Sequence, residues 1–339
     1  MFVESGLGWF TPSGAWPTIG EMKLEEVELG KIDFDDRRFR ISRPSRLDNL
    51  LQSISEIGLI NPPVVTIKAG CFVIVSGWKR VEACRRLSFL SLPCHVLGEC
   101  TDLQAFQIAI QDNSTTRELS VSERAEILKR LKGFGVTEDS LVITYLPLLG
   151  IPRTRIHLDA YLAISELEPE SKEFIDERKV SFPVLMHLIA LDRLGREQVL
   201  PLLRHLGQNK QRELLEYLLE ISRRDSVPVP SLLSSEETRP VIQSAALSPL
   251  QKADKVRMIL KRKRYPAFSA KKESFESSLK RIGWPEDTAL DPPPFFEGEE
   301  FTVKFTFKDS GEFREKVDKL RSLDEKGRIS ELLNALSDD

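Results

Sequence analysis

The residues of this sequence with the clearest capacity for chemistry follow a short apolar run. Cys71 to Val75 is typical of a buried strand, Ser76-Gly77 supplies a turn, and apolar residues then recur at helical spacing. Such a turn leaves the first N–H groups of the helix unpaired, and the helix dipole favours an anion there. Lys79 and Arg80 lie in that first turn, where cations are unfavourable unless an anion binds beside them. The sequence therefore predicts a phosphate-binding site.

A second set of polar residues lies between two expected helices. The first helix spans about residues 102–111 and is followed directly by Asp112 and Asn113, and Ser120 to Glu123 forms a capping box for the next. Arg117 then lies in a short loop, which suits a side chain that contacts a ligand. Asp112 and Asn113 either cap the helix end or supply oxygen ligands to Mg²⁺ beside bound phosphates.

Three segments together resemble the ParB-type partition proteins. Ser76 to Ala83 is similar to their Gly-Glu-Arg-Arg-x-Arg-Ala box, Ile57 to Val65 to their Gly-Leu-x-x-Pro segment, and Asp112 to Arg117 to their Glu-Asn-x-x-Arg box. Trp78 and Lys79 replace the usual Glu-Arg pair of the central box. In the third box Asp112 replaces Glu, and the arginine comes one position later than in the commonest spacing.

The resemblance implies a CTP-dependent DNA clamp that acts in chromosome or plasmid partition, with slow CTP hydrolysis reopening the clamp. It implies a homodimer, duplex DNA as partner and a Walker-type partition ATPase beside it. The nucleotide-binding residues that it implies are Gly58, Leu59, Pro62, Ser76, Gly77, Lys79, Arg80 and Arg117. It assigns Mg²⁺ to Asp112 and Asn113.

A helix-turn-helix is expected after these boxes, as in partition proteins and the related KorB repressors. Leu141 to Leu149 and Arg153 to Leu167 read as two helices around a turn at Gly150. The buried stripe of the second helix is predicted from its apolar spacing to be Ile156, Ala160, Ala163 and Leu167. The residues expected to contact DNA are Arg153, Thr154, Arg155 and His157. Residues 137–224 hold 12 basic against 14 acidic residues, so an ordinary surface helix stays the alternative.

The chain as a whole is expected to be an α+β multidomain protein. The predicted parts are a flexible arm (1–20), a ParB/sulfiredoxin-like α/β domain (21–119), an all-α helix-turn-helix domain (120–225), a linker (226–247) and a small α+β self-association domain (248–339). Residues 245–285 carry a net charge of +8 and residues 286–339 a net charge of −7. The two blocks form either a nucleic-acid surface beside an acidic segment or surfaces that pack together.

The last predicted domain contains a strand at Phe301 to Lys308 whose apolar face needs a partner, which suggests a second copy of the chain. The four cysteines (Cys71, Cys84, Cys94 and Cys100) show no Cys-x-x-Cys pair and are interpreted as reduced core thiols. No apolar run approaches the roughly 20 residues that span a membrane, so we expect a cytoplasmic protein associated with the nucleoid or a plasmid.

Three other functions were weighed against the partition clamp. Sulfiredoxins share the N-terminal fold, but Trp78 occupies the place of their catalytic cysteine. A ParB-like nuclease would need a cluster of acidic metal ligands, and no such spacing is evident. A KorB-like repressor without a role in segregation fits the helix-turn-helix equally well and stays open.

Overall fold

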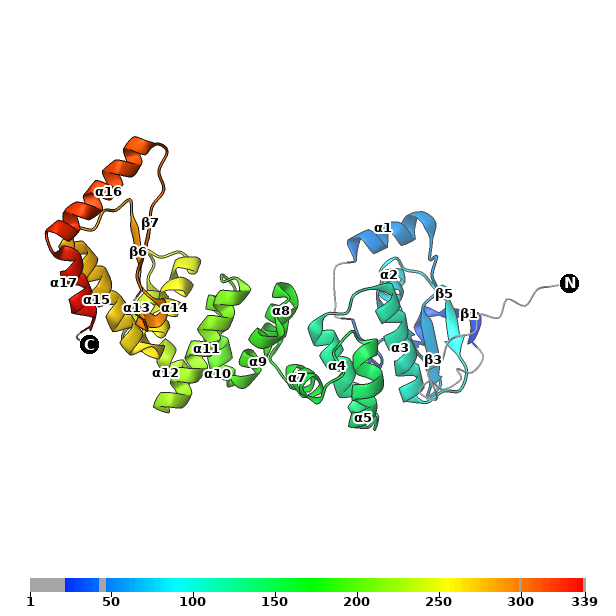
Figure 1. Cartoon of the computed structure of the whole chain (residues 1–339). Helices are drawn as coiled ribbons and strands as arrows, with labels where there is room; N and C mark the ends of the chain where they lie inside the picture. The colour runs from blue at the N-terminus through cyan, green and yellow to red at the C-terminus, as the bar shows by residue number, and fades with distance from the viewer. Residues whose placement is uncertain (1–21, 43–46, 299, 338–339) are drawn as a thin grey trace. The chain divides into compact units, whose positions relative to one another are not determined.

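The computed structural model describes residues 22–42, 47–298 and 300–337 (Figure 1). Its contacts divide the chain into two compact units, residues 1–190 and 191–339, which are described separately below. The expected arm at residues 1–20 lies outside the described residues. Within the described residues no helix combines the length and apolarity that a membrane crossing requires.

A mixed five-stranded sheet forms the centre of the first part of unit 1. Its order is β1-β5-β3-β4-β2, with β1/β5 and β3/β4 antiparallel and β3/β5 and β2/β4 parallel. The strands are β1 Met22–Glu28, β2 Ile32–Asp33, β3 Val64–Lys68, β4 Cys71–Ser76 and β5 Ser91–Leu97. Strands β3 and β4 form a hairpin around Ala69 and Gly70.

Both faces of this sheet are covered, which explains why β4 is apolar in almost every position. Ile74 packs in one cluster with Val65 and Cys94, and residues of α1 Asp48–Ile57 and α2 Trp78–Arg86 join it. Val73 and Val75 point to the opposite face and are also fully buried. Helix α3, Asp102–Thr116, packs against β4. The strand that leads to the Gly77 turn is therefore held from two sides.

Helix α3 is longer than the sequence predicted. The hydroxyl groups of Ser114, Thr115 and Thr116 donate to carbonyls one turn earlier, so the polar run continues the helix instead of ending it. Asp112 and Asn113 consequently lie inside α3, and Arg117 is its C-cap residue.

The remaining part of unit 1 is helical. It consists of α4 Val121–Gly133, α5 Glu138–Ser140, the π-helical turn η2 Leu141–Tyr145, α6 Leu146–Leu148, α7 Arg155–Ser165, α8 Pro169–Arg178 and α9 Phe182–Ala190. The capping box of α4 is confirmed, with Ser120 and Glu123 bonding reciprocally. Gly150, at a φ of 67°, makes the turn between α6 and α7, as the helix-turn-helix pattern requires.

The buried stripe of α7 begins later than predicted. Leu158, Ala160, Tyr161 and Ile164 are buried, whereas Ile156 is 54% exposed. The prediction for Ile156 is therefore wrong. The helix begins at Arg155, so Ile156 occupies the first turn, and burial on its face starts one turn later at Ala160.

Unit 2 is mostly helical. It contains α10 Arg193–Leu203, α11 Gln208–Asp225, α12 Val229–Leu233, α13 Arg239–Gln243, α14 Pro249–Arg264, α15 Pro266–Ile282, η3 Pro294–Phe296, α16 Ser310–Glu325 and α17 Arg328–Ser337, with a two-stranded sheet of β6 Ala289–Asp291 and β7 Thr302–Lys304. Residues 226–247, expected as a linker, contain α12 and α13, and Val229, Leu232 and Leu233 are buried there. These apolar residues give the segment a packing role.

Helices α11 and α14 pack together within unit 2. Arg257 Nη1 lies 2.7 Å from Glu213 Oε2, and Arg264 also pairs with Glu220. Part of the basic block at residues 245–285 is therefore neutralised by acidic residues of α11.

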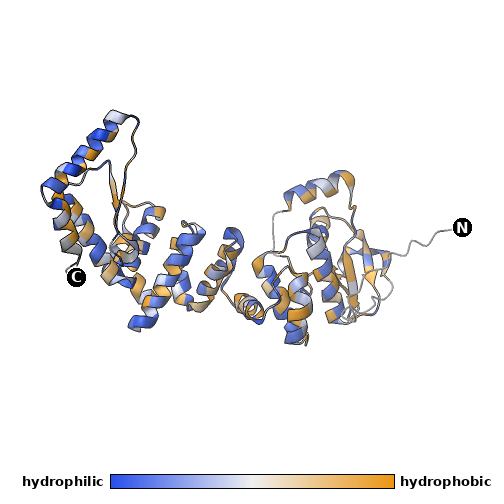
Figure 2. Ribbon diagram, in the orientation of Figure 1, coloured by the Kyte–Doolittle hydropathy of each residue, from blue (hydrophilic) through white to orange (hydrophobic). Residues whose placement is uncertain are grey.

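The expected strand over Phe301 to Lys308 pairs only at Thr302–Lys304, with β6 as its partner within the same chain. Beyond it, Phe305 and Phe307 approach Phe313 of α16, with ring centroids 5.9 Å and 5.0 Å away. Figure 2 shows α16 as mostly hydrophilic with hydrophobic residues at intervals. Phe305 and Phe307 therefore lie beyond the paired part of the strand, because they pack on Phe313 of α16.

Candidate functional site

The turn between β4 and α2 can be made only by glycine. Gly77 has a φ of 90°, in the left-handed region. A Cβ atom placed on it would lie 2.7 Å from Pro63 Cβ and 3.0 Å from Pro63 Cα. Gly77 is the N-cap of α2 and gives no side-chain cap to the helix N-terminus. The turn therefore packs directly against the segment that precedes β3, which brings two of the three sequence boxes together.

Arg80 joins that contact to the third box. Its Nη1 donates to the carbonyl oxygens of Asn61 (2.8 Å) and Pro62 (3.2 Å). Its Nη2 lies 3.7 Å from Asp112 Oδ2, and the same oxygen accepts a hydrogen bond from the hydroxyl of Ser76. One guanidinium group and one carboxylate thus connect the loop before β3, the end of β4 and helix α3.

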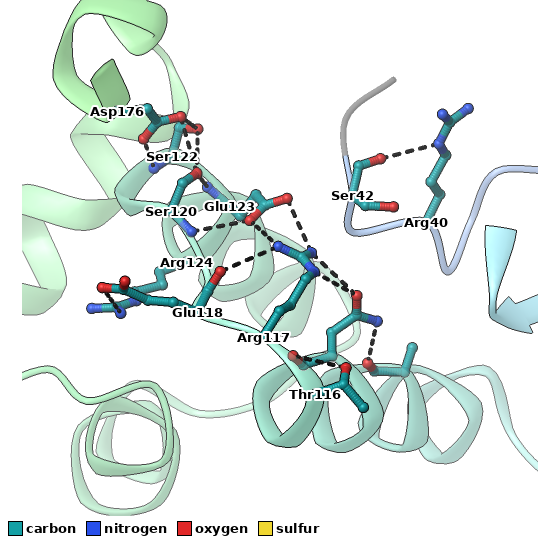
Figure 3. Close-up of polar contacts among 12 residues, drawn as sticks. Arg40, Ser42, Thr116, Arg117, Glu118, Ser120, Ser122, Glu123, Arg124 and Asp176 are labelled. Carbon is teal, nitrogen blue, oxygen red and sulfur yellow. Dashed lines mark hydrogen bonds and ion pairs between the residues drawn. The ribbon is translucent and has the colours of Figure 1, made fainter. Parts of the chain in front are cut away.

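A second arginine extends the network to α4 (Figure 3). Arg117 donates from Nε (3.2 Å) and Nη2 (3.1 Å) to Asn113 Oδ1. It also donates from Nη1 to Glu123 Oε2 (2.7 Å) and from Nη2 to Glu123 Oε1 (3.1 Å). Glu123 Oε2 accepts the Ser120 N–H at 3.0 Å as well, so one carboxylate caps α4 and holds Arg117. The N-terminus of α4 is fixed further by Asp176 of α8, which accepts from the Ser120 hydroxyl at 3.0 Å.

A basic pocket of about 270 Å³ lies along α2, from Trp78 and Lys79 at the N-terminus of the helix to Arg85 and Arg86 at its end. Its aromatic wall is Phe34 and Trp78, and its charged lining is Arg37, Arg40, Lys79, Arg85 and Arg86 with Asp35 and Glu82. The Arg40 guanidinium carbon lies 5.1 Å from the centroid of the Trp78 ring. Burial, and then the charge of Arg37, lowers the pKa of Arg40. Arg85 and Arg86 pair with Glu82, and the positive charges of Arg37, Arg40 and Lys79 favour an anion in the pocket.

The other residues assigned by resemblance have structural contacts. Gly58 ends α1 at a φ of 75°, and its N–H donates to the Ile54 carbonyl at 3.0 Å. Leu59 packs against the core cluster of the sheet. The Pro62 carbonyl accepts from Arg80, as described above. Trp78 is 9% exposed and belongs to the same core cluster, so its ring covers the core.

The oxygen atoms predicted to bind Mg²⁺ are occupied by protein donors. Asp112 Oδ2 faces Ser76 and Arg80, and Asn113 Oδ1 faces Arg117. Over the part of the chain that the structure describes, no three His, Cys, Asp or Glu side chains gather as a metal site. In this conformation Asp112 Oδ2 and Asn113 Oδ1 would have to exchange these protein donors for a metal ion, so Mg²⁺ binding by the pair stays a prediction.

The start of α7 is shaped by Thr154 and His157. Thr154 is the N-cap, and its hydroxyl lies 2.7 Å from His157 Nδ1. The His157 ring stacks on Phe182 of α9, with centroids 4.1 Å apart. Both residues were predicted to contact DNA, and their described contacts fix the helix end against its neighbour.

The two predicted arginines of α7 also have partners within the protein. Pro147 lacks the N–H that an α-helix would direct to the Ile143 carbonyl, and Arg153 Nη2 donates to that carbonyl at 2.9 Å. Arg155 pairs with Glu138 and lies 3.5 Å from Asp159, while its side chain stays 56% exposed. More than half of the Arg155 side-chain surface is therefore accessible to a ligand, although the side chain also forms ion pairs.

Three residues of these networks were not singled out in the sequence. Glu123 was predicted only as part of a capping box, and Arg40 was not predicted to have a role. Glu138 precedes the helix-turn-helix and carried no signal. Their roles depend on partners that only folding brings near them, and the local spacing of residues does not encode those partners.

The fold is that of a protein with a mixed five-stranded sheet, in which a strand–glycine–helix turn joins β4 to α2, followed by a largely helical region. Residues 17–114 match the ParB N-terminal domain family. The chain therefore contains a ParB N-terminal domain, and it is a distant homologue of ParB-type proteins over about half of its length.

Two relatives illustrate the distance. The chromosome-partitioning protein Spo0J of Thermus thermophilus is 26% identical over 197 residues, which cover 57% of this chain and 69% of that protein. The nucleoid occlusion protein of Halalkalibacterium halodurans is 27% identical over 217 residues, which cover 59% and 74%.

Solved structures of the C-terminally truncated ParB from Caulobacter crescentus are also similar. The complex with the centromeric parS site has 20% identity and a TM-score of 0.36, covering 57% of this chain and 98% of that chain. The complex with CTP-γ-S has 23% identity and a TM-score of 0.25, covering 52% and 97%.

Proposed function

We propose that this chain is a ParB-type partition protein that binds CTP beside the Gly77 turn and contacts duplex DNA through α7. One observation carries the nucleotide part: Gly77, Arg80 and Asp112, which belong to distant segments or to the turn itself, meet at the N-terminus of α2, and Arg117 binds Asn113, the neighbour of Asp112 on α3. A helix N-terminus with lysine and arginine beside it suits a phosphate group.

The side chain of Lys79 is the simplest phosphate ligand. It lines the basic pocket beside Arg40, and no ion pair within the described residues uses it. Arg80 is committed to the carbonyl groups before β3, so it holds the turn in shape while its charge adds to the site. When bound, CTP supplies a polyanionic triphosphate.

Mg²⁺ coordination by Asp112 and Asn113 stays a prediction. It requires both oxygen atoms to release the arginine and serine donors that now occupy them. Arg117 would then be available to the phosphates, and Glu123 would keep only its capping bond to the Ser120 N–H.

The DNA part of the proposal rests on the exposed start of α7. Arg155 is 56% exposed and Ile156 is 54% exposed, so a cation and an apolar group stand side by side at the helix start. Such helix starts meet base edges in helix-turn-helix proteins. Self-association through residues 248–339 and cooperation with a Walker-type ATPase belong to the same proposal, as does an association with the nucleoid or a plasmid.

Calorimetry of the full chain with CTP, ATP, GTP and UTP in the presence of Mg²⁺ tests the nucleotide site. We expect CTP to bind best and Lys79→Ala to weaken it about tenfold to a hundredfold, as for a lost charge-assisted contact of roughly 1.5–3 kcal/mol. Thermal stability should not change, because Lys79 holds no described ion pair. Lys31→Ala is the matched control, since Lys31 is exposed and pairs only with Glu28. If no nucleotide binds at millimolar concentration, the proposal is wrong.

A further inference from the structure

Glu138 holds two exposed cations at the start of the helix-turn-helix. Its Oε1 lies 2.8 Å from Lys132 Nζ at the end of α4, and its Oε2 pairs with Arg155 at the start of α7. The side chains of Lys132 and Arg155 are 50% and 56% exposed, and that of Glu138 is 35% exposed. The hydrogen bond from Lys132 has the largest effect on the pKa of Glu138 and lowers it, and the positive charge of Arg155 lowers it further. The carboxylate is thus ionised and shared.

These cations would otherwise be suitable contacts for a nucleic-acid backbone. Exposed lysine and arginine side chains bind phosphates and release counterions, and the affinity of nucleic-acid complexes depends mainly on such contacts. A carboxylate beside them competes with phosphate for the same donors and repels the phosphate itself. Arg153 does not share this arrangement, because its guanidinium group donates to the Ile143 carbonyl.

The carboxylate is not required for the local fold. Thr137 caps α5 through its hydroxyl, which accepts from the Ser140 N–H. Ion pairs between side chains this exposed contribute little to stability. A network that stabilises the fold so weakly can still determine how the surface meets a polyanion.

We propose that Glu138 sets the DNA affinity of the α7 surface by holding Arg155 and Lys132 away from the phosphate backbone. This inference rests on the proposed contact between α7 and duplex DNA. Glu138 acts as a positioning residue, because its effect passes through the two cations that it binds. Weakening of this restraint should strengthen binding, which is the opposite of what the loss of an ordinary structural contact does.

The test measures binding of the full chain to a fluorescent duplex of about 30 base pairs at several salt concentrations. Glu138→Gln should tighten binding about threefold to thirtyfold near 0.1 M salt. It should also steepen the log–log salt dependence by about 0.9 for each newly contacted phosphate. Adding Arg155→Ala to Glu138→Gln should remove much of this gain, and Glu138→Asp, which keeps the charge, should restore the restraint.

Glu166→Gln is the matched control. Glu166 is the C-cap residue at the opposite end of α7 and pairs with Lys129 at 3.0 Å, so its substitution removes the same charge from another surface. If Glu138→Gln binds like the wild type at every salt concentration while Arg155→Ala weakens binding, the inference is wrong and the DNA surface stands. If the wild type and Glu138→Gln both fail to bind duplex DNA, the proposed DNA contact itself is wrong and the inference falls with it.

Discussion

Arg117 and Glu123 form a two-point ion pair across the loop between α3 and α4, with Nη1–Oε2 at 2.7 Å and Nη2–Oε1 at 3.1 Å. The Glu123 side chain is only 9% exposed, and the Arg117 guanidinium group compensates the cost of burying its carboxylate. A phosphate that recruits Arg117 must therefore compete with a nearly buried carboxylate. The proposed phosphate site and the N-terminus of α4 would therefore be coupled through this one arginine.

Glu123→Gln should lower the free energy of unfolding by about 1–3 kcal/mol, because it removes charge-assisted hydrogen bonds from Arg117. The same substitution should increase nucleotide affinity, since Arg117 no longer has a carboxylate to leave. Denaturant titration and calorimetry measure the two effects in one preparation. Arg117→Ala is the comparison, and it should lower both stability and nucleotide affinity. Equal losses of affinity in the two variants would show that Arg117 does not reach the ligand.

Gly77→Ala should disrupt the β4–α2 turn. The new methyl group would clash with Pro63, and an alanine at this position would have to adopt a φ of 90°. We therefore expect the free energy of unfolding to fall by more than the 1 kcal/mol or so that an unfavourable φ alone costs. Nucleotide binding should be lost with it. Gly70→Ala is the matched control, because Gly70 has a φ of 82° in the β3–β4 hairpin but open space around it. If the two substitutions cost the same in thermal denaturation, the close approach to Pro63 is unimportant.

The sheet and its turn could be predicted because each depends on local pattern. Two apolar runs separated by Lys68-Ala69-Gly70 determine the hairpin, and the glycine after β4 determines the turn. The partners of Asp112 and Arg117 could not be predicted, because these contacts depend on the long-range packing of α3 against β4 and on the carboxylate that caps α4. Local propensity also failed at Ser114 to Thr116, where hydroxyl bonds to the backbone extend α3 beyond its expected end.

The cysteine prediction was correct for the core positions and wrong for Cys71. Cys84 and Cys94 are buried, but Cys71 is exposed on β4 and Cys100 is intermediate. Burial, with a smaller effect of Glu26, raises the pKa of Cys94 to about 12. Thiol reagents at pH 8 should therefore modify Cys71 rapidly and Cys94 only on unfolding, because the thiolate is the reactive form. Mass spectrometry of partially labelled protein identifies the sites, and rapid labelling of Cys94 in the folded chain would contradict the structure.

The same pKa predicts a loss of stability in alkali. The folded protein keeps the Cys94 proton up to about pH 12, whereas the unfolded chain loses it near the ordinary value of 9.0. The unfolded state thus binds fewer protons between these values, and the stabilisation present below pH 9 falls as pH rises, by at most about 1.4 kcal/mol per pH unit. Denaturant titrations at pH 8 and pH 10 should show a smaller decrease for Cys94→Ala than for the wild type. An identical decrease would assign the effect to other groups.

The helical regions show where sequence reasoning was limited in another way. The inward residues of α11 follow from their helical spacing, since Leu214, Leu215 and Leu218 lie on one face and are all fully buried. The association of α11 with α14 was not predicted, because complementary charges such as Glu213 and Arg257 identify each other only after folding. The boundaries expected at residues 225 and 248 stay predictions, and the contacts of the chain instead separate at residue 190.

The last prediction concerns self-association of unit 2. Phe307, Phe313 and Val317 are 54%, 40% and 38% exposed, and Phe313 and Val317 lie one turn apart on α16. An aromatic and aliphatic patch of this kind is typical of a contact surface, and a twofold dimer is the common arrangement. Because β7 already pairs with β6 in the same chain, we place the contact on this patch and not on a strand edge.

Val317→Glu should convert the dimer to a monomer in sedimentation experiments at micromolar concentration. A carboxylate in a desolvated apolar interface is costly, whereas the same group on the free monomer stays hydrated and leaves the fold intact. Leu250→Glu is the matched control, because Leu250 is 50% exposed on α14 and lies outside the patch. A wild-type chain that sediments as a monomer, or a Val317→Glu variant that stays dimeric, would exclude this surface as the site of self-association.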